Sequence, residues 1–268
     1  MKPVAKITGL ILLLMLFGVV FAGWKLYEKE IHDRRWMRWE AEMQEAMTEI
    51  SDKHIFSLLS KLKNVDQPLN SVKQTPLILV AGIKFEQNNE KTLKALLDRG
   101  ANINQKDENG YTPLTTALNS RLDSKCIDLL LARGADPNLS GSWGTPLNAS
   151  MPYETSYCMK ALLKAGARVG TGKDLTTKPY VVFAAELEDL DLIKLLLQKG
   201  ANVNIKGGQN ETALIIAVQK RDSKIAKFLV EHGADVNAKD AGGVTAMKLA
   251  TKSGDKELIE ALKAKTVK

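Results

Sequence analysis

A cluster of four carboxylates is the first group in this sequence that could do chemistry. Glu186, Glu188, Asp189 and Asp191 stand within one short stretch. Carboxylate oxygens are the ligands that Ca²⁺ and Mg²⁺ prefer, so the stretch could suggest a cation site. The four residues begin a predicted helix, however, where acidic side chains cap the backbone and complement the helix dipole. No further ligand accompanies them at a suitable spacing, and we therefore expect no metal here.

A glycine-rich stretch is the second candidate. Residues 170–173, with the sequence GTGK, resemble part of a phosphate-binding loop. Their spacing from Gly166 is wrong for such a loop, Asp174 stands where Ser or Thr is required, and no strand precedes them. We interpret the stretch as a junction between structural units. The histidines are scattered, and no nucleophile stands beside a partnered base. The sequence thus predicts no enzyme, no cofactor and no small-molecule substrate.

The elements that must position any functional residue are repetitive. Three features recur about every 33 residues: a Thr-Pro-Leu opening or a variant of it, a leucine pair, and a Gly-Ala step. The second copy shows the pattern well, with Thr112-Pro113-Leu114 followed by Leu129-Leu130 and Gly134-Ala135. The other openings begin at Thr75, Thr145, Lys178, Thr212 and Thr245. Repetition at this period indicates a stack of short units.

Each copy predicts a pair of helices. Pro113 suits the first turn of a helix, after a polar turn at residues 107–110 that we expect to supply the cap. Gly134 is suited to a left-handed C-cap of the second helix. The second helix carries an apolar stripe, at Ile127, Leu130 and Leu131. One such pair cannot bury its apolar face alone, so neighbouring pairs must stack around a shared core.

This pattern resembles the ankyrin repeat, from the Thr-Pro-Leu opening to the closing Gly-Ala-Asn/Asp-x-Asn, over roughly residues 70–264. The resemblance implies an all-α solenoid of about five to six helix-turn-helix repeats within residues 72–268. The repeats fall near residues 72–107, 108–140, 141–173, 174–207, 208–240 and 241–266. The histidine of the family's Thr-Pro-Leu-His motif is replaced in every copy, so some stabilising hydrogen bonds should be absent. Extra residues around Phe85 to Glu90 should form a surface connection.

The N-terminal segment differs in kind from the repeats. After a short basic tail at residues 1–6, residues 7–24 form an apolar run without a charge. A helix of this length, about 27 Å, is long enough to span a bilayer core of roughly 30 Å. We therefore predict a transmembrane signal anchor with the lipid bilayer as its partner. A cleaved signal peptide is the alternative, because Val20-Phe21-Ala22 is a tolerable cleavage site. Cleavage would leave a secreted, soluble ankyrin protein.

Charges near the apolar run are split between its two sides, with Lys2 and Lys6 before it and Lys25, Lys29 and several arginines after it. We favour a cytoplasmic N-terminus, which in a bacterium makes this a single-pass inner-membrane protein with its repeats in the periplasm. Residues 25–71 are expected to form a helical connector and N-terminal cap that seals the first repeat. A dimerising role for Trp36, Trp39, Met43 and Met47 is the alternative.

The formal net charge is +7, but the lysines of the repeats are scattered among acids. A solvated surface is therefore favoured over nucleic-acid binding. Cys126 and Cys158 fall on predicted second helices of adjacent repeats, where the stripe is apolar. We interpret both as buried free thiols, and they do not decide the compartment.

The function that remains is protein binding. In ankyrin-repeat proteins the turn tips and the exposed side of each first helix line a concave face that binds a partner. The corresponding residues here are Glu108, Asn109, Tyr111, Asn119, Ser142, Trp143, Tyr153, Glu211, Gln219, Lys220, Val244 and Lys252. Tyr111, Trp143 and Tyr153 are typical interface anchors, although Trp143 could equally pack onto its own repeat.

The resemblance predicts a protein-interaction module, and the apolar run at residues 7–24 predicts its tether to a membrane. It could serve as a periplasmic immunity or protective factor against a toxin, or as a scaffold. A regulatory subunit of an associated enzyme is the rival hypothesis from another class.

Overall fold

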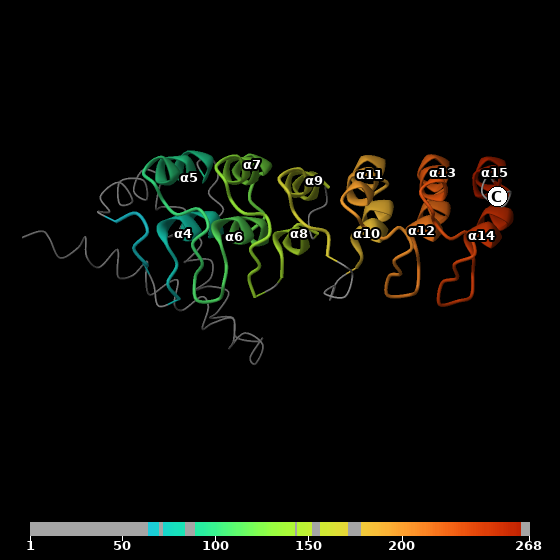
Figure 1. The fold of residues 1–268 in the computed structure, drawn as a ribbon, viewed down its shortest axis with the longest axis horizontal. Coiled ribbons are helices and arrows are strands. Elements are labelled where there is room, and N and C mark those ends of the chain that lie inside the picture. The colour runs from blue at the N-terminus through green and yellow to red at the C-terminus, as the bar shows by residue number, and fades with distance from the viewer. Residues whose placement is uncertain are drawn as a thin grey trace, which may run out of the picture. The chain divides into compact units, whose positions relative to one another are not determined.

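The computed structural model describes residues 64–69, 72–83, 89–142, 144–151, 156–170 and 178–263. The chain divides into two compact units, Met1–Gly144 and Thr145–Lys268 (Figure 1). The predicted anchor at residues 7–24 lies outside the described residues, as does most of the predicted connector at 25–71. Among the helices that are described, none has the length and apolar character needed to cross a membrane.

The described part of the first unit contains two helix pairs. Its helices are α4 (Pro76–Gly82), α5 (Asn89–Asp98), α6 (Pro113–Asn119) and α7 (Ser124–Ala132). The first helices of the pairs, α4 and α6, pack against each other, and so do the second helices, α5 and α7. A Cβ atom at Gly82 would lie 3.3 Å from Cγ2 of Thr116, so α4 and α6 approach closely at that point.

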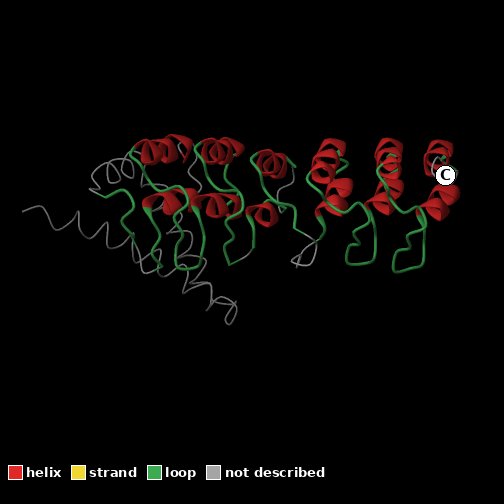
Figure 2. Cartoon of the chain, viewed as in Figure 1, coloured by secondary structure: helices red, strands yellow, loops and turns green. Residues whose placement is uncertain are grey.

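The second unit, taken by itself, is also built of helix pairs. Its helices are α8 (Pro146–Ala149), α9 (Tyr157–Lys164), α10 (Tyr180–Glu186), α11 (Leu190–Gln198), α12 (Ala213–Gln219), α13 (Ser223–Glu231), α14 (Ala246–Ser253) and α15 (Lys256–Lys263). First helices α10, α12 and α14 form one layer, and second helices α11, α13 and α15 form the other. The described turns project from the first helices, away from the second-helix layer (Figure 2). The prediction of repeated helix pairs is confirmed.

The described first helices begin at threonine caps, except α10, whose N-cap is Pro179. Thr112 Oγ1 accepts the N–H of Thr115 at 3.2 Å, and Thr115 Oγ1 in turn accepts the N–H of Thr112 at 2.8 Å. This reciprocal pair is a capping box, and it stands where the family's motif has its histidine. Single threonine caps of the same kind begin other first helices, at Thr75, Thr145, Thr212 and Thr245. The expectation that residues 107–110 supply the cap is therefore wrong, because Thr112 supplies it.

The second helix of the same pair ends as its sequence predicts. Gly134 follows the C-cap with φ +90°, a left-handed conformation that costs a residue with a Cβ atom about 1–2 kcal/mol. The N–H of Ala135 then donates to the carbonyl of Leu130 at 3.0 Å, which satisfies one of the free carbonyl groups at the helix end.

The core of each unit is formed by leucine-rich faces of both helix layers. Ile127 and Leu130 of the predicted stripe are fully buried, whereas Leu131 is only half-buried. Leu162, Leu196 and Leu229 are fully buried in the second unit.

The structure also tests two smaller predictions, about the cysteines and about the connection around Phe85 to Glu90. Cys126 and Cys158 are buried and are not in a disulfide, as expected, and burial raises the pKa of the Cys126 thiol to about 11. The predicted connection around Phe85 to Glu90 is shorter than expected, because Asn89 and Glu90 already belong to α5. Asn89 is itself buried, and its side-chain amide donates to the carbonyl of Val80 at 3.1 Å.

Candidate protein-binding surface

The turn before α6 is held in one conformation by Asp107. Its carboxylate accepts the N–H groups of Asn109 at 3.0 Å and Tyr111 at 2.8 Å, and its own N–H donates to the carbonyl of Tyr111 at 3.0 Å. Burial raises the pKa of the Asp107 carboxyl above its ordinary value, although these N–H donors act in the opposite direction. The turn therefore presents Glu108 and Asn109 on an ordered backbone.

Successive turns in the first unit are bonded to one another. The hydroxyl of Ser142 donates to the carbonyl of Asn109, and the N–H of Glu108 donates to the carbonyl of Val72 at 3.0 Å. Glu108 also forms an ion pair with Lys73, with 3.0 Å between Oε1 and Nζ. The structure thus brings three predicted binding residues, Glu108, Asn109 and Ser142, into one connected surface.

Tyr111 lies at this surface but is half-buried. A Cβ atom at Gly141 would lie only 2.6 Å from Cδ1 of Tyr111, so the ring packs directly on the backbone of the next turn. Burial, and secondarily the charge of Asp107, raises the pKa of the Tyr111 phenol. Tyr111 is therefore less exposed than the repeat register suggested, although part of its ring remains accessible.

Three further aromatic residues bear on the predicted binding surface. Trp143 and Tyr153 both lie outside the described residues. Tyr157, which sequence reasoning missed, is 46% exposed in the first turn of α9. Tyr157 precedes the buried pair Cys158 and Met159, so it lies outside the apolar stripe of the helix. An aromatic residue outside that stripe was the feature of the sequence that could have indicated an exposed ring.

The second unit presents the remaining predicted residues. The carboxylate of Glu211 accepts the N–H of Gln209 at 2.7 Å, and the N–H of Val244 donates to the Asp240 carboxylate at 2.8 Å. The two turns are joined where the N–H of Ala241 donates to the carbonyl of Gln209 at 2.7 Å. Exposed side chains at or near the ends of first helices are Asn119 in the first unit, and Gln219, Lys220 and Lys252 in the second.

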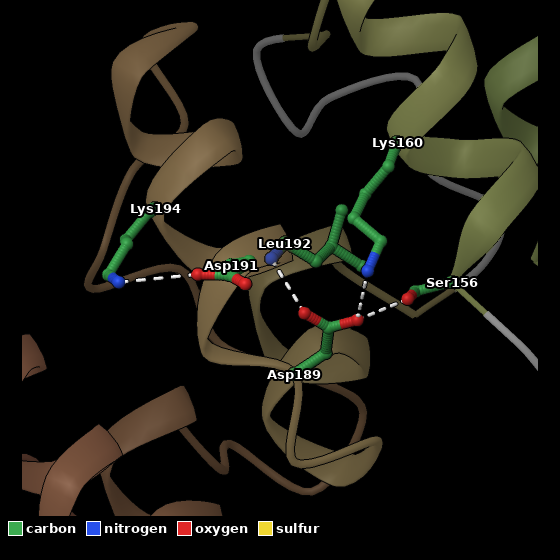
Figure 3. A network of polar contacts seen from close by, with 6 residues as sticks. All are labelled: Ser156, Lys160, Asp189, Asp191, Leu192 and Lys194. Carbon is green, nitrogen blue, oxygen red and sulfur yellow. Dashed lines mark hydrogen bonds and ion pairs between the residues drawn. The ribbon is translucent and has the colours of Figure 1, made fainter.

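The four carboxylates of the acidic cluster at residues 186–191 form a helix cap and ion pairs within the fold. Asp189 caps α11 by accepting the N–H of Leu192 at 2.8 Å (Figure 3). It also accepts a bond from the Ser156 hydroxyl and forms an ion pair with Lys160, at 2.8 Å, so it joins two consecutive repeats. Ion pairs likewise engage the other members, Glu186 with Lys178, Glu188 with Lys220 and Asp191 with Lys194. Within the described ranges, no group of His, Cys, Asp or Glu is arranged to hold a metal ion.

The Asp189 network should make stability depend on pH. Burial opposes ionisation of Asp189, but the bonds from Lys160, Ser156 and Leu192 outweigh it and lower the pKa of the carboxyl. A carboxyl with a lowered folded-state pKa stabilises the fold above its unfolded value of about 3.9, and this contribution is lost as pH falls through the folded value. We expect Asp189→Asn to cost about 1 to 3 kcal/mol of unfolding free energy at neutral pH.

The measurement is urea unfolding of both proteins between neutral and acid pH. The gap between the parent and Asp189→Asn should narrow as pH falls below about 4. Asp191→Asn is the matched control, because Asp191 is exposed and its partner Lys194, which is partly exposed, lies on the same helix. A gap that stays constant over the acid range would show that the charge of Asp189 does not stabilise the fold.

Comparison with known proteins identifies the family. The family model described as ankyrin repeats, three copies, matches residues 44–141, 78–173 and 181–268. The chain belongs to the ankyrin-repeat family, whose repeats form interaction modules and are typically non-enzymatic. Each unit is accordingly an all-helical ankyrin-repeat array.

Individual relatives agree with this assignment. A putative ankyrin repeat protein of Rickettsia bellii is 28% identical over 169 residues, which cover 60% of this chain and 42% of that protein. The chain thus spans less than half of that relative's length, and only 11% of mouse Rabankyrin-5. The crystal structure of the ankyrin repeat protein EF0377 is 29% identical, with a TM-score of 0.52 over 76% of this chain and 99% of that one.

A second solved structure shows the same fold. It is the complex of the predatory endopeptidase Bd0816 from Bdellovibrio bacteriovorus with immunity protein Bd3460. The match is 24% identical, with a TM-score of 0.52 over 70% of this chain and 97% of the matched chain.

Proposed function

We propose that this protein is a membrane-tethered interaction module that binds a partner protein through its turns and the exposed sides of its first helices. The observation that carries the proposal is the bonding within and between turns. Asp107 and Asp240 hold their own turns, and bonds such as Ser142 to Asn109 and Ala241 to Gln209 join neighbouring turns. A surface ordered before binding loses little conformational freedom when a partner docks.

The tether in this proposal is the apolar run at residues 7–24. With the repeats placed in a bacterial periplasm, two versions are open, an immunity or protective factor and a scaffold for a resident membrane complex. The structural similarity to the Bdellovibrio complex shows that an immunity protein can have this fold. At 24% identity it does not indicate which partner this chain binds. Two alternatives remain for experiment to test: a regulatory subunit that modulates an associated enzyme, and a secreted protein produced by cleavage of the N-terminal segment.

The tether is tested in native membranes. The full chain should remain in the membrane pellet after washing with alkaline carbonate, because transfer of the apolar run into water is unfavourable. The N-terminal sequence of the mature protein is determined in parallel. Release by carbonate together with a mature N-terminus at Gly23 would contradict the anchor and support a secreted protein.

The binding role is tested by site-specific photo-crosslinking in native host cells. A crosslinking residue at Ser142, in an exposed turn, should trap a partner protein for mass spectrometry. The matched control is a crosslinker at Lys125, which is also exposed but lies on second helix α7. A trapped hydrolase favours immunity, and a resident membrane complex favours scaffolding. Equal trapping at both positions, or no trapping at either, would contradict binding through the turns. Turnover of a substrate by the purified chain would instead support the hypothesis that the protein is an enzyme.

A further inference from the structure

The bonds that join neighbouring turns are of two kinds, and the first kind is made by the backbone alone. The N–H of Glu108 donates to the carbonyl of Val72 at 3.0 Å, and the N–H of Ala241 donates to the carbonyl of Gln209 at 2.7 Å. Each donor stands four residues before the threonine cap of its own first helix, and each acceptor stands three residues before the cap of the preceding one. The two joints therefore occupy the same place in the repeat.

The joint to Asn109 is of the second kind, because a side chain makes it. By its place in the repeat, Gly141 is the residue whose N–H should donate to the carbonyl of Asn109. That N–H donates instead to the carbonyl of Gly144 at 3.0 Å, within its own turn. The hydroxyl of Ser142 is the donor to Asn109 in its place.

The sequence explains this exchange of donors. In the turns before α6 and α14, an aspartate five residues before the cap, Asp107 or Asp240, holds the turn by accepting backbone N–H groups. Ser140 has that place in the turn that ends at Gly144, and it offers no carboxylate. Gly141 and Gly144 close this turn instead, because each donates its N–H to the carbonyl of the other, at 3.0 and 3.1 Å. The joint to the preceding turn is thereby left to a side chain.

The same hydroxyl also contacts Tyr111. The phenol of Tyr111 is hydrogen-bonded to Ser142, and its ring lies so close to Gly141 that a Cβ atom there would be 2.6 Å from Cδ1. One exposed serine side chain therefore contacts two residues of the predicted binding surface, Asn109 and Tyr111. In the first unit, the order of this surface depends on a group that a single substitution removes.

We infer that Ser142 is a positioning residue of the binding surface, whose hydroxyl holds Asn109 and Tyr111 in the arrangement that a partner meets. This inference rests on the proposed function and names the side chain that orders the surface in the first unit. Order of this kind lowers the conformational entropy that is lost when a complex forms. The joint at Gln209 needs no such side chain, because the N–H of Ala241 makes it.

The test is hydrogen–deuterium exchange of the full chain in a neutral detergent, with fragmentation that resolves single amides. In Ser142→Ala, after correction for intrinsic exchange rates, the N–H groups of Gly141, Gly144 and Tyr111 should exchange about fivefold faster than in the parent. The reason is that local opening of the turn no longer breaks the bonds of the hydroxyl. Ser142→Thr keeps a hydroxyl at this position and should restore the rates of the parent.

Two reference amides separate a positioning role from a merely structural one. The N–H of Leu130, in the buried core of α7, exchanges through opening of the fold, so its rate should not change in Ser142→Ala. The N–H of Ala241 belongs to a joint made by the backbone and should also keep its rate.

The matched control variant is Ser140→Ala. Ser140 is exposed in the same turn, and its bond from Lys106 is accepted by the carbonyl, which the substitution retains. Its exchange rates should stay within about twofold of the parent. Unchanged exchange in Ser142→Ala, an equal rise in Ser140→Ala, or failure of Ser142→Thr to restore the rates would overturn the inference. An equal rise at Leu130 would overturn it too, because the hydroxyl would then stabilise the whole unit rather than position the turn.

These outcomes differ from a failure of the proposed function, because the exchange test uses no partner. The crosslinking residue at Ser142 lacks the hydroxyl, but a covalent trap accumulates the complex even when the turn is looser. If this crosslinker traps a partner while Ser142→Ala exchanges like the parent, binding through the turns stands and the positioning role is rejected. If exchange rises as expected while neither Ser142 nor Lys125 traps a partner, the proposed function fails and Ser142 remains a joint between turns.

Discussion

Replacing Leu196 by Ala is expected to lower the unfolding free energy of the second unit by about 2 to 5 kcal/mol. Leu196 is fully buried in α11, which packs against α9 and α10. The substitution removes apolar surface from the core and leaves a cavity that a tightly stacked array cannot fully close. Denaturant unfolding followed by far-ultraviolet circular dichroism measures the change. Leu130→Ala in α7 should have an effect of similar size in the first unit.

The matched control for Leu196→Ala is Lys220→Ala in the same unit. Lys220 is exposed, and its ion pair with Glu188 is a solvent-accessible contact that contributes little. Its removal should change the unfolding free energy by no more than about 0.5 kcal/mol. Equal unfolding midpoints for the two variants would show that the assignment of core and surface in this repeat is wrong.

The second large effect is expected on partner binding. Tyr111→Ala should weaken the complex with the crosslinked partner by about 2 kcal/mol, close to thirtyfold in Kd, because partly exposed aromatic rings in ordered turns are common binding anchors. Isothermal titration of the identified partner into the full chain measures the change. Because the ring also packs on Gly141, a modest loss of stability should accompany the loss of affinity.

Tyr111→Phe separates the two effects. It retains the ring against Gly141 and removes the phenol hydroxyl with its hydrogen bond to Ser142, so most of the lost stability and most of the lost affinity should return. If Tyr111→Ala binds the partner as tightly as the parent, the anchor lies elsewhere, and exposed Tyr157 on α9 becomes the next candidate.

Local rules in the sequence determined the helix pairs. A proline after Thr112 and a glycine after α7 act on the backbone of their own turn, so the start and the end of these helices could be predicted without knowledge of the neighbours. The buried positions Ile127 and Leu130 follow from helical spacing for the same reason. The error about the cap had a local cause too, because Asp107 and Thr112 are both good capping residues, and only the hydrogen bonds distinguish them.

Contacts between repeats depended on the tertiary structure. Asp189 reads in the sequence as a helix cap, which it is, but its bonds to Ser156 and Lys160 join residues of two stacked repeats. Tyr111 reads as an exposed turn residue, but the next turn brings Gly141 against its ring. Periodicity determines which residues face a neighbouring repeat. How closely the neighbour approaches depends on the packing of both helix layers, and that distance decides whether a turn side chain is free to bind a partner or is used to join two repeats.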